Sequence, residues 1–181
     1  MRAVPITVTA LAAALLLTAC SGGDDSGSGD TASKASGSGS EAAGSACAFD
    51  DLGQDVGPVD AAPAAGDTGN VTVTLTNKGA ECTLDGLPTV GLSADGDPVS
   101  VPQDPAAQAQ KLTVPEQGTV TFTITYVRGE SGDKSLAVKT VEYSLPGSDK
   151  TESFPWSYGD VSLKSAGEPD ASVGAFTQAG D

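Results

Sequence analysis

Cysteines and carboxylates are the side chains of this 181-residue sequence that could do chemistry, because it contains no histidine. Without imidazole, the chain cannot assemble a Ser-His-Asp or Cys-His catalytic set, and it has no imidazole ligand for a metal ion. The 24 acidic and 9 basic residues give a formal net charge of -15, which disfavours contact with nucleic acid. We therefore expect a protein that is not an enzyme, holds no cofactor or metal, and binds no nucleic acid.

Cys20 is the cysteine with the most specific surroundings. It follows Leu17-Thr18-Ala19 after an apolar run that is short for a membrane-spanning helix and suits a secretory signal. This order is typical of bacterial lipoprotein signals, in which the small residues fit the signal peptidase and the cysteine thiol takes diacylglycerol. The pattern predicts a signal peptide at 1–19 and a lipid anchor that holds the protein at the extracytoplasmic face of the cell membrane. An ordinary signal peptide with a chance cysteine is the alternative.

Cys47 and Cys82 remain as a pair outside the cytoplasm, where a disulfide is the default state of two cysteines. The bridge would close a loop of about 35 residues and contribute about 3–4 kcal/mol by the loop-entropy relation. Two reactive thiols are the alternative, but the surrounding sequence is not basic enough to favour the thiolate form. We expect the disulfide.

The carboxylates offer three candidate pairs, each in a polar turn sequence: Asp50 with Asp51, Asp95 with Asp97, and Asp149 with Glu152. A glycoside hydrolase needs two carboxyl groups at a defined separation across a cleft, and closeness in sequence does not provide that separation. Calcium could also bind clustered loop carboxylates, but the spacing matches no calcium loop. We expect these side chains to be solvated charges.

A change of composition divides the chain into parts. Within 21–46, 15 of 26 residues are Gly or Ser, so we expect a flexible tether together with the lipidated cysteine at 20–46. The folded domain is expected at 47–165. The remaining tail, 166–181, would be flexible or would dock on the domain through Val173 and Phe176.

Alternation of apolar and polar residues dominates the expected domain. At 71–76 and 120–126, apolar side chains alternate with threonine, which predicts antiparallel strands with one face in a core and one in water. A further strand at 136–145 changes phase near Lys139-Thr140, as a β-bulge would. Short strands separated by turn residues predict an all-β, immunoglobulin-like antiparallel β-sandwich, with a small closed β-barrel as the alternative.

The sequence after the first long strand resembles the signature of the bacterial domain of unknown function 4232. The matching positions are Asn77, Gly79, Cys82, Leu84, Gly86, Pro88 and Val90, with Cys47 at the place of the family's first cysteine. The resemblance covers roughly residues 47–163 and weakens after Tyr126, where many members have further cysteines. It implies an immunoglobulin-like sandwich in lipoproteins or secreted proteins of high-GC Gram-positive bacteria. It implies no reaction, because the family has no established activity.

One aromatic concentration stands out in a chain with few aromatic residues. Phe154, Trp156 and Tyr158 alternate along a short segment. If exposed, they could stack on sugar rings or form the centre of a protein interface. The alternative is that they belong to the core of the sandwich.

Two function classes follow from these patterns. The first is a membrane-anchored cell-envelope lipoprotein whose non-catalytic sandwich binds a protein or glycan partner. The second is an envelope hydrolase, or a weak divalent-metal binder, that uses carboxylates alone. We expect the first, because an anchor, a tether and a β-domain suit presentation of a binding surface, and a fold alone specifies no reaction.

Overall fold

The computed structural model describes residues 44–179, so the expected signal peptide, Cys20 and most of the expected tether lie outside the described residues. The regular structure in this range is β-strand, apart from one short 3-10 turn, η1 (Phe49–Asp51). No helix in the described range is long and apolar enough to cross a membrane.

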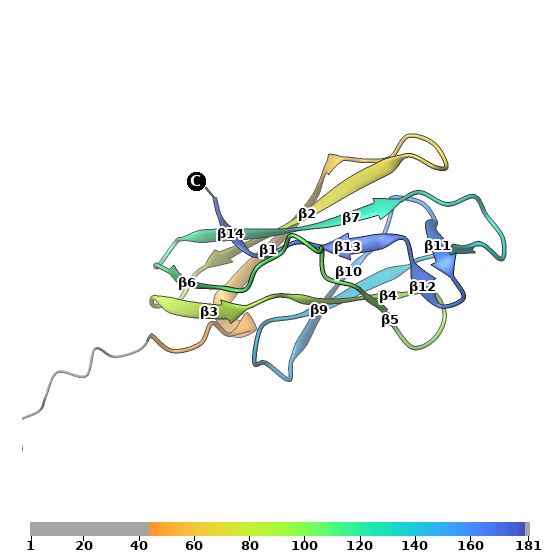
Figure 1. Cartoon of the computed structure of the whole chain (residues 1–181). Coiled ribbons are helices and arrows are strands. Elements are labelled where there is room, and N and C mark those ends of the chain that lie inside the picture. The colour runs from red at the N-terminus through yellow and green to blue at the C-terminus, as the bar shows by residue number, and fades with distance from the viewer. Residues whose placement is uncertain (1–43, 180–181) are drawn as a thin grey trace, which may run out of the picture. The chain divides into compact units, whose positions relative to one another are not determined.

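The larger of two main sheets is antiparallel and has the order β1-β2-β7-β13, with β14 also paired to β7 (Figure 1). The long central strands occupy one layer of the domain, and short C-terminal strands line its edge. The bounds are β1 (Leu52–Asp60), β2 (Thr68–Asn77), β7 (Thr119–Val127), β13 (Ala171–Val173) and β14 (Thr177–Gln178).

The second main sheet is also antiparallel and has the order β10-β9-β4-β5. Its strands are β4 (Thr89–Ser93), β5 (Val99–Val101), β9 (Thr140–Ser144) and β10 (Thr151–Pro155). In Figure 1 these strands form the layer opposite β2 and β7.

Two small antiparallel sheets complete the domain at its ends. One pairs β3 (Cys82–Gly86) with β6 (Gln110–Val114). The other has the order β12-β11-β8, from β8 (Ser135–Leu136), β11 (Val161–Ser165) and β12 (Glu168–Pro169).

Alternation along the central strands builds the core. On β2 and β7 every second residue is buried, and the register places Val73 opposite Phe122 with threonines on the other face. The Phe122 ring lies 5.3 Å from the ring of Tyr143 on the opposite sheet. Two antiparallel sheets that pack face to face through such side chains form a β-sandwich. The predicted fold class is therefore confirmed, and none of the described sheets closes into the alternative barrel.

The expected strand at 136–145 is divided rather than bulged. Residues up to Leu136 belong to β8 in the small end sheet, and β9 in the second main sheet begins at Thr140. Between them the Val138 N–H donates to the carbonyl of Leu136, and Lys139 donates to Ser93. The change of phase marks the point where the chain passes from one sheet to another.

The folded domain extends beyond the expected boundary at residue 165. β13 and β14 both pair with β7, and the side chain of Phe176 is 2% exposed. Val173 is buried as well, so the segment expected as a tail provides edge strands and core residues.

Candidate partner-binding surfaces

The aromatic segment proposed from the sequence as a binding site lies in the core. Phe154 is 5% exposed and Trp156 is 7% exposed, while Tyr158 is half-buried against them. The Trp156 ring packs edge-on against the rings of Tyr126 and Tyr158, with both centroid separations 4.9 Å. Its indole N–H donates to the carbonyl of Gly159 at 2.6 Å. Because Trp156 is almost fully buried and its indole N–H is already hydrogen-bonded, this segment offers no aromatic platform to a ligand.

Hydrogen bonds close the sandwich around these aromatic rings. The Tyr126 hydroxyl accepts from the Ala62 N–H at 3.3 Å and donates to the Tyr158 carbonyl at 3.1 Å. The Arg128 guanidinium donates to the carbonyls of Ala62 and Pro63 at 2.9 and 3.0 Å. Burial, together with the neighbouring Tyr126, raises the pKa of the Tyr158 phenol. These contacts hold the loop after β1 against the sandwich and serve packing.

The carboxylates proposed as pairs do not converge on a common point with other ligands. Asp50 accepts a hydrogen bond from Lys150 at 2.6 Å, and Asp95 forms an ion pair with Lys139. In the part of the chain that the structure describes, no group of three or more His, Cys, Asp or Glu side chains is placed to hold a metal ion.

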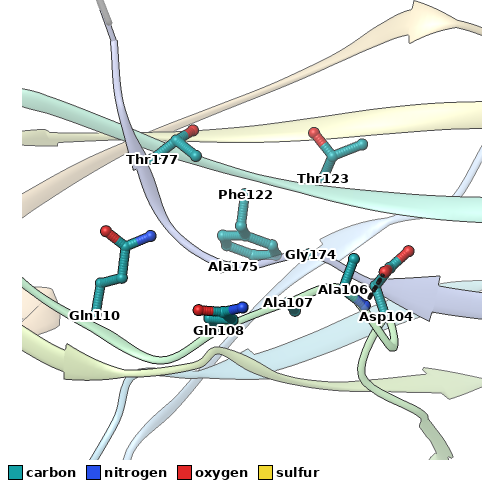
Figure 2. A pocket seen from close by; sticks show the side chains of 10 residues that line it. All are labelled: Asp104, Ala106, Ala107, Gln108, Gln110, Phe122, Thr123, Gly174, Ala175 and Thr177. Carbon is teal, nitrogen blue, oxygen red and sulfur yellow. Dashed lines mark hydrogen bonds between the residues drawn. The ribbon is translucent and has the colours of Figure 1, made fainter.

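A groove of about 420 Å³ lies beside the edge of β7 (Figure 2). The groove forms because the C-terminal segment stops pairing with β7 after β13 and pairs with it again only at β14. The Gly174 N–H still donates to the Thr123 carbonyl at 2.9 Å, and pairing resumes where Thr177 lies opposite Thr121. The opposite wall is the segment 104–110. The lining side chains and glycine are Asp104, Ala106, Ala107, Gln108, Gln110, Phe122, Thr123, Gly174, Ala175 and Thr177.

Backbone hydrogen bonds fix the two walls of this groove relative to each other. The Val173 N–H donates to the Pro102 carbonyl at 3.0 Å, and the Asp104 N–H donates to the Val173 carbonyl at 2.8 Å. The Asp104 carboxylate also accepts from the Ala106 N–H at 2.7 Å, the bond that Figure 2 draws as a dashed line. The groove is therefore preformed by main-chain pairing rather than by side chains alone.

The lining of the groove is mostly uncharged. Methyl groups of three alanines provide apolar surface above the buried Phe122 ring, and two glutamine amides can both donate and accept hydrogen bonds. The hydroxyls of Thr123 and Thr177 already hydrogen-bond to those of Thr72 and Thr121. Asp104 is the only ionised side chain among the lining residues. Such a lining suits an uncharged polar chain, for example an extended peptide main chain with small side chains.

The N-terminal edge of the domain is held by the disulfide between Cys47 and Cys82. Both cysteines are buried, and Ala46, next to Cys47, forms an isolated parallel bridge with Thr83 of β3. The Cys47 N–H donates to the Thr83 carbonyl at 3.0 Å, and the Thr83 N–H donates to the Ser45 carbonyl at 2.9 Å.

A protein-family model matches residues 47–177, which run from the first cysteine of this disulfide to the first residue of β14. The model is described as a domain of unknown function, DUF4232. The chain belongs to the DUF4232 family. No curated protein and no solved structure matches the chain. The DUF4232 match also includes β13, which agrees with the folded domain continuing past residue 165.

The sequence signature of the DUF4232 domain marks structural positions in this chain. Asn77 is completely buried, and its side chain hydrogen-bonds to four backbone groups of neighbouring turns. Gly86 has φ of 135°, a conformation that favours glycine, and Leu84 and Val90 are core residues. The signature therefore reports turns, the disulfide and the core, and the groove lies elsewhere.

Sequence reasoning did not identify the groove. Its lining comes from three segments that are separate in the sequence, 104–110, 122–123 and 174–177, and 104–110 shows neither a periodic pattern nor a motif. The enrichment of 106–110 in alanine and glutamine is the sequence feature that could have pointed to the groove, because alanine is small and the glutamine amide forms hydrogen bonds.

Proposed function

We propose that this chain is a lipid-anchored protein of the cell envelope, and that its DUF4232 domain binds a protein partner at the groove beside β7. The observation that supports binding is the mostly uncharged, hydrogen-bonding lining of a 420 Å³ groove, with Asp104 as its one carboxylate, in a chain of net charge -15. An extended segment of a partner could place its main chain against the glutamines and its small side chains against the alanines. A glycan is the other partner that the sequence suggests.

The proposed anchor rests on the sequence around Cys20. Leu17-Thr18-Ala19-Cys20 followed by a Gly/Ser-rich segment would leave the domain on a tether at the extracytoplasmic face of the membrane. Two acyl chains would be needed for stable attachment, because a single chain binds membranes only marginally. Metabolic labelling with an alkyne fatty acid should mark the wild-type chain and leave Cys20→Ala unlabelled. Unmodified Cys20 in the mass spectrum of the purified protein would reject the anchor.

Partner binding can be tested by filling the groove without disturbing the core. Ala106 is an exposed lining residue, so Ala106→Trp should obstruct the groove, while Ala166→Trp in the turn after β11 is a matched control. After crosslinking in intact envelopes, we expect one protein to be recovered with the wild type and with the control, and lost with Ala106→Trp. Equal recovery with all three chains, or recovery of a glycan alone, would contradict the proposal.

A further inference from the structure

A second, smaller cavity lies between β1 and β10, the strands that form neighbouring edges of the two main sheets. Its volume is about 130 Å³, roughly that of four water molecules. The lining residues that are buried, Phe49, Leu75 and Tyr143, form its base. Gln54 and Glu152 are exposed and form its mouth, with Leu52 half-buried between the two groups.

The strand register explains why polar groups meet in this cavity. Glu152 is the direct cross-strand neighbour of Tyr143, so both side chains project to the same face of the second sheet. Gln54 lies opposite Leu75 and therefore projects inward from the first sheet. The Tyr143 hydroxyl donates to the Gln54 side-chain oxygen at 2.6 Å and joins the two sheets.

The cavity presents one negative charge beside aromatic rings. The Tyr143 phenol carries no charge at physiological pH, and burial, followed by the charge of Glu152, raises its pKa further above the ordinary value of 10.0. Glu152 provides the one carboxylate among the residues that line the cavity. Within the described residues Glu152 belongs to no ion pair, because the nearby ammonium of Lys150 bonds to Asp50 at 2.6 Å.

The rings of Phe49 and Tyr143 complete an environment that suits a cation. Their centroids are 5.5 Å apart and nearly perpendicular, at 84°. Ring faces attract ammonium groups, and apolar ring surface also packs against methylene carbons. The net charge of -15 draws cations toward the whole molecule and repels anions.

We propose that this cavity binds a primary alkylammonium, supplied by a lysine side chain of the protein partner. Glu152 is the counter-ion of the ammonium at the mouth, and the rings of Phe49 and Tyr143 form the apolar base against which the methylenes pack. Lysine suits the site better than arginine, because its charged end is a compact ammonium that can approach the single carboxylate of Glu152. This inference rests on the proposed function, since it names a chemical feature of the partner, but it concerns a site separate from the groove.

The test uses the full chain in detergent, labelled with ¹³C-tyrosine. The probe is Nα-acetyl-lysine amide, in which the side-chain ammonium is free. The chain has three tyrosines, and Tyr126 and Tyr158 lie together in the other aromatic cluster, where they serve as internal references. We expect saturable shifts of the Tyr143 ring signals with a Kd on the order of 1–10 mM, and none with uncharged N-acetyl-norleucine amide. N-acetyl-arginine amide should bind more weakly.

Two variants separate a specific site from general electrostatic attraction. Glu152→Gln should weaken binding about three- to tenfold, because the counter-ion is lost while the shape is kept. Glu142→Gln removes the same charge from the adjacent strand on the opposite face of the sheet and should leave binding unchanged. A silent Tyr143, equal binding of the arginine probe, or equal weakening by both variants would overturn the proposal. If the crosslinking experiment recovers a partner but the Tyr143 ring signals do not shift, only the lysine site is rejected. If the Tyr143 signals shift but no partner depends on the groove, only the groove is rejected.

Discussion

The side-chain amide of Asn77 lies 3.1 Å from the carbonyl oxygen of Val114, a residue 37 positions further along the chain. The two residues are the last of β2 and of β6. The same amide donates to the carbonyls of Ala80 at 2.8 Å and Pro115 at 3.2 Å, and its oxygen accepts from the Gly79 N–H at 3.0 Å. One side chain, 0% exposed, thus joins the turn after β2 to the turn between β6 and β7.

Removal of this amide should destabilise the domain strongly. We expect Asn77→Ala to lower the free energy of unfolding by about 2–4 kcal/mol, because it leaves buried backbone groups without partners. Asn70→Ala is the matched control, since Asn70 accepts one partly buried bond from Thr125 and its loss should cost about 1 kcal/mol. Urea denaturation measures both. Equal midpoints for the two variants would contradict the central role of Asn77.

The disulfide should provide a comparable share of stability. Cys47→Ser or Cys82→Ser should lower the free energy of unfolding by about 3–4 kcal/mol, because the bridge closes a separation of 35 residues. The reduced wild type should unfold close to the two variants. Alkylation followed by mass spectrometry is a direct check: Cys47 and Cys82 should react only after reduction. Their reaction in denaturant without a reductant would show that they are free thiols.

The sequence predicts the sandwich well because its central strands are long and strictly alternating. The same reasoning missed β13 and β14, since strands of three and two residues are too short for a pattern and are specified by the open edge of β7. It also missed the passage between sheets at Val138, where local alternation cannot reveal which sheet a strand joins. The groove depends on these same features, so it could not be predicted without the topology.

Truncation tests the position of the domain boundary. A chain that ends at Ser165 should fail to fold, because it lacks the β7-edge strands and the buried Val173 and Phe176, each of which contributes packing worth about 1–5 kcal/mol. A chain that ends at Ala179 retains every described strand and should unfold like the wild type. Circular dichroism and thermal unfolding compare the two. Cooperative unfolding of the shorter chain would show that the folded domain ends at residue 165.

Fluorescence reports directly on the corrected position of the aromatic segment. Trp156 is the only tryptophan, so the tryptophan fluorescence of the chain comes from this residue alone. We expect a blue-shifted maximum in the folded state and little quenching by iodide, because the ring is 7% exposed. Trp156→Phe should reduce stability by about 1–2 kcal/mol, since the Gly159 carbonyl loses its donor. An emission maximum at the position of free tryptophan would show that the segment with Phe154, Trp156 and Tyr158 lies at the surface.

Tyr143 should make stability depend on pH in the alkaline range. Its pKa is raised in the folded state from an ordinary value of 10.0, first by burial and second by Glu152. The folded state therefore keeps a proton that the unfolded state loses above about pH 10. Below about pH 10 the contribution of the Tyr143 phenol to the free energy of unfolding is fully present. As pH rises further, the unfolding free energy should fall by up to about 1.4 kcal/mol per pH unit.

The variant Tyr143→Phe isolates this effect from the titration of other groups, which both chains share. At neutral pH it should be about 1 kcal/mol less stable, because Gln54 loses the hydroxyl donor. Above about pH 10 its unfolding free energy should fall less steeply than that of the wild type, so the two curves converge. Urea midpoints from neutral to strongly alkaline pH measure the difference. Curves that stay parallel would mean that the Tyr143 phenol titrates equally in both states, and that burial and Glu152 do not raise its pKa in the folded state.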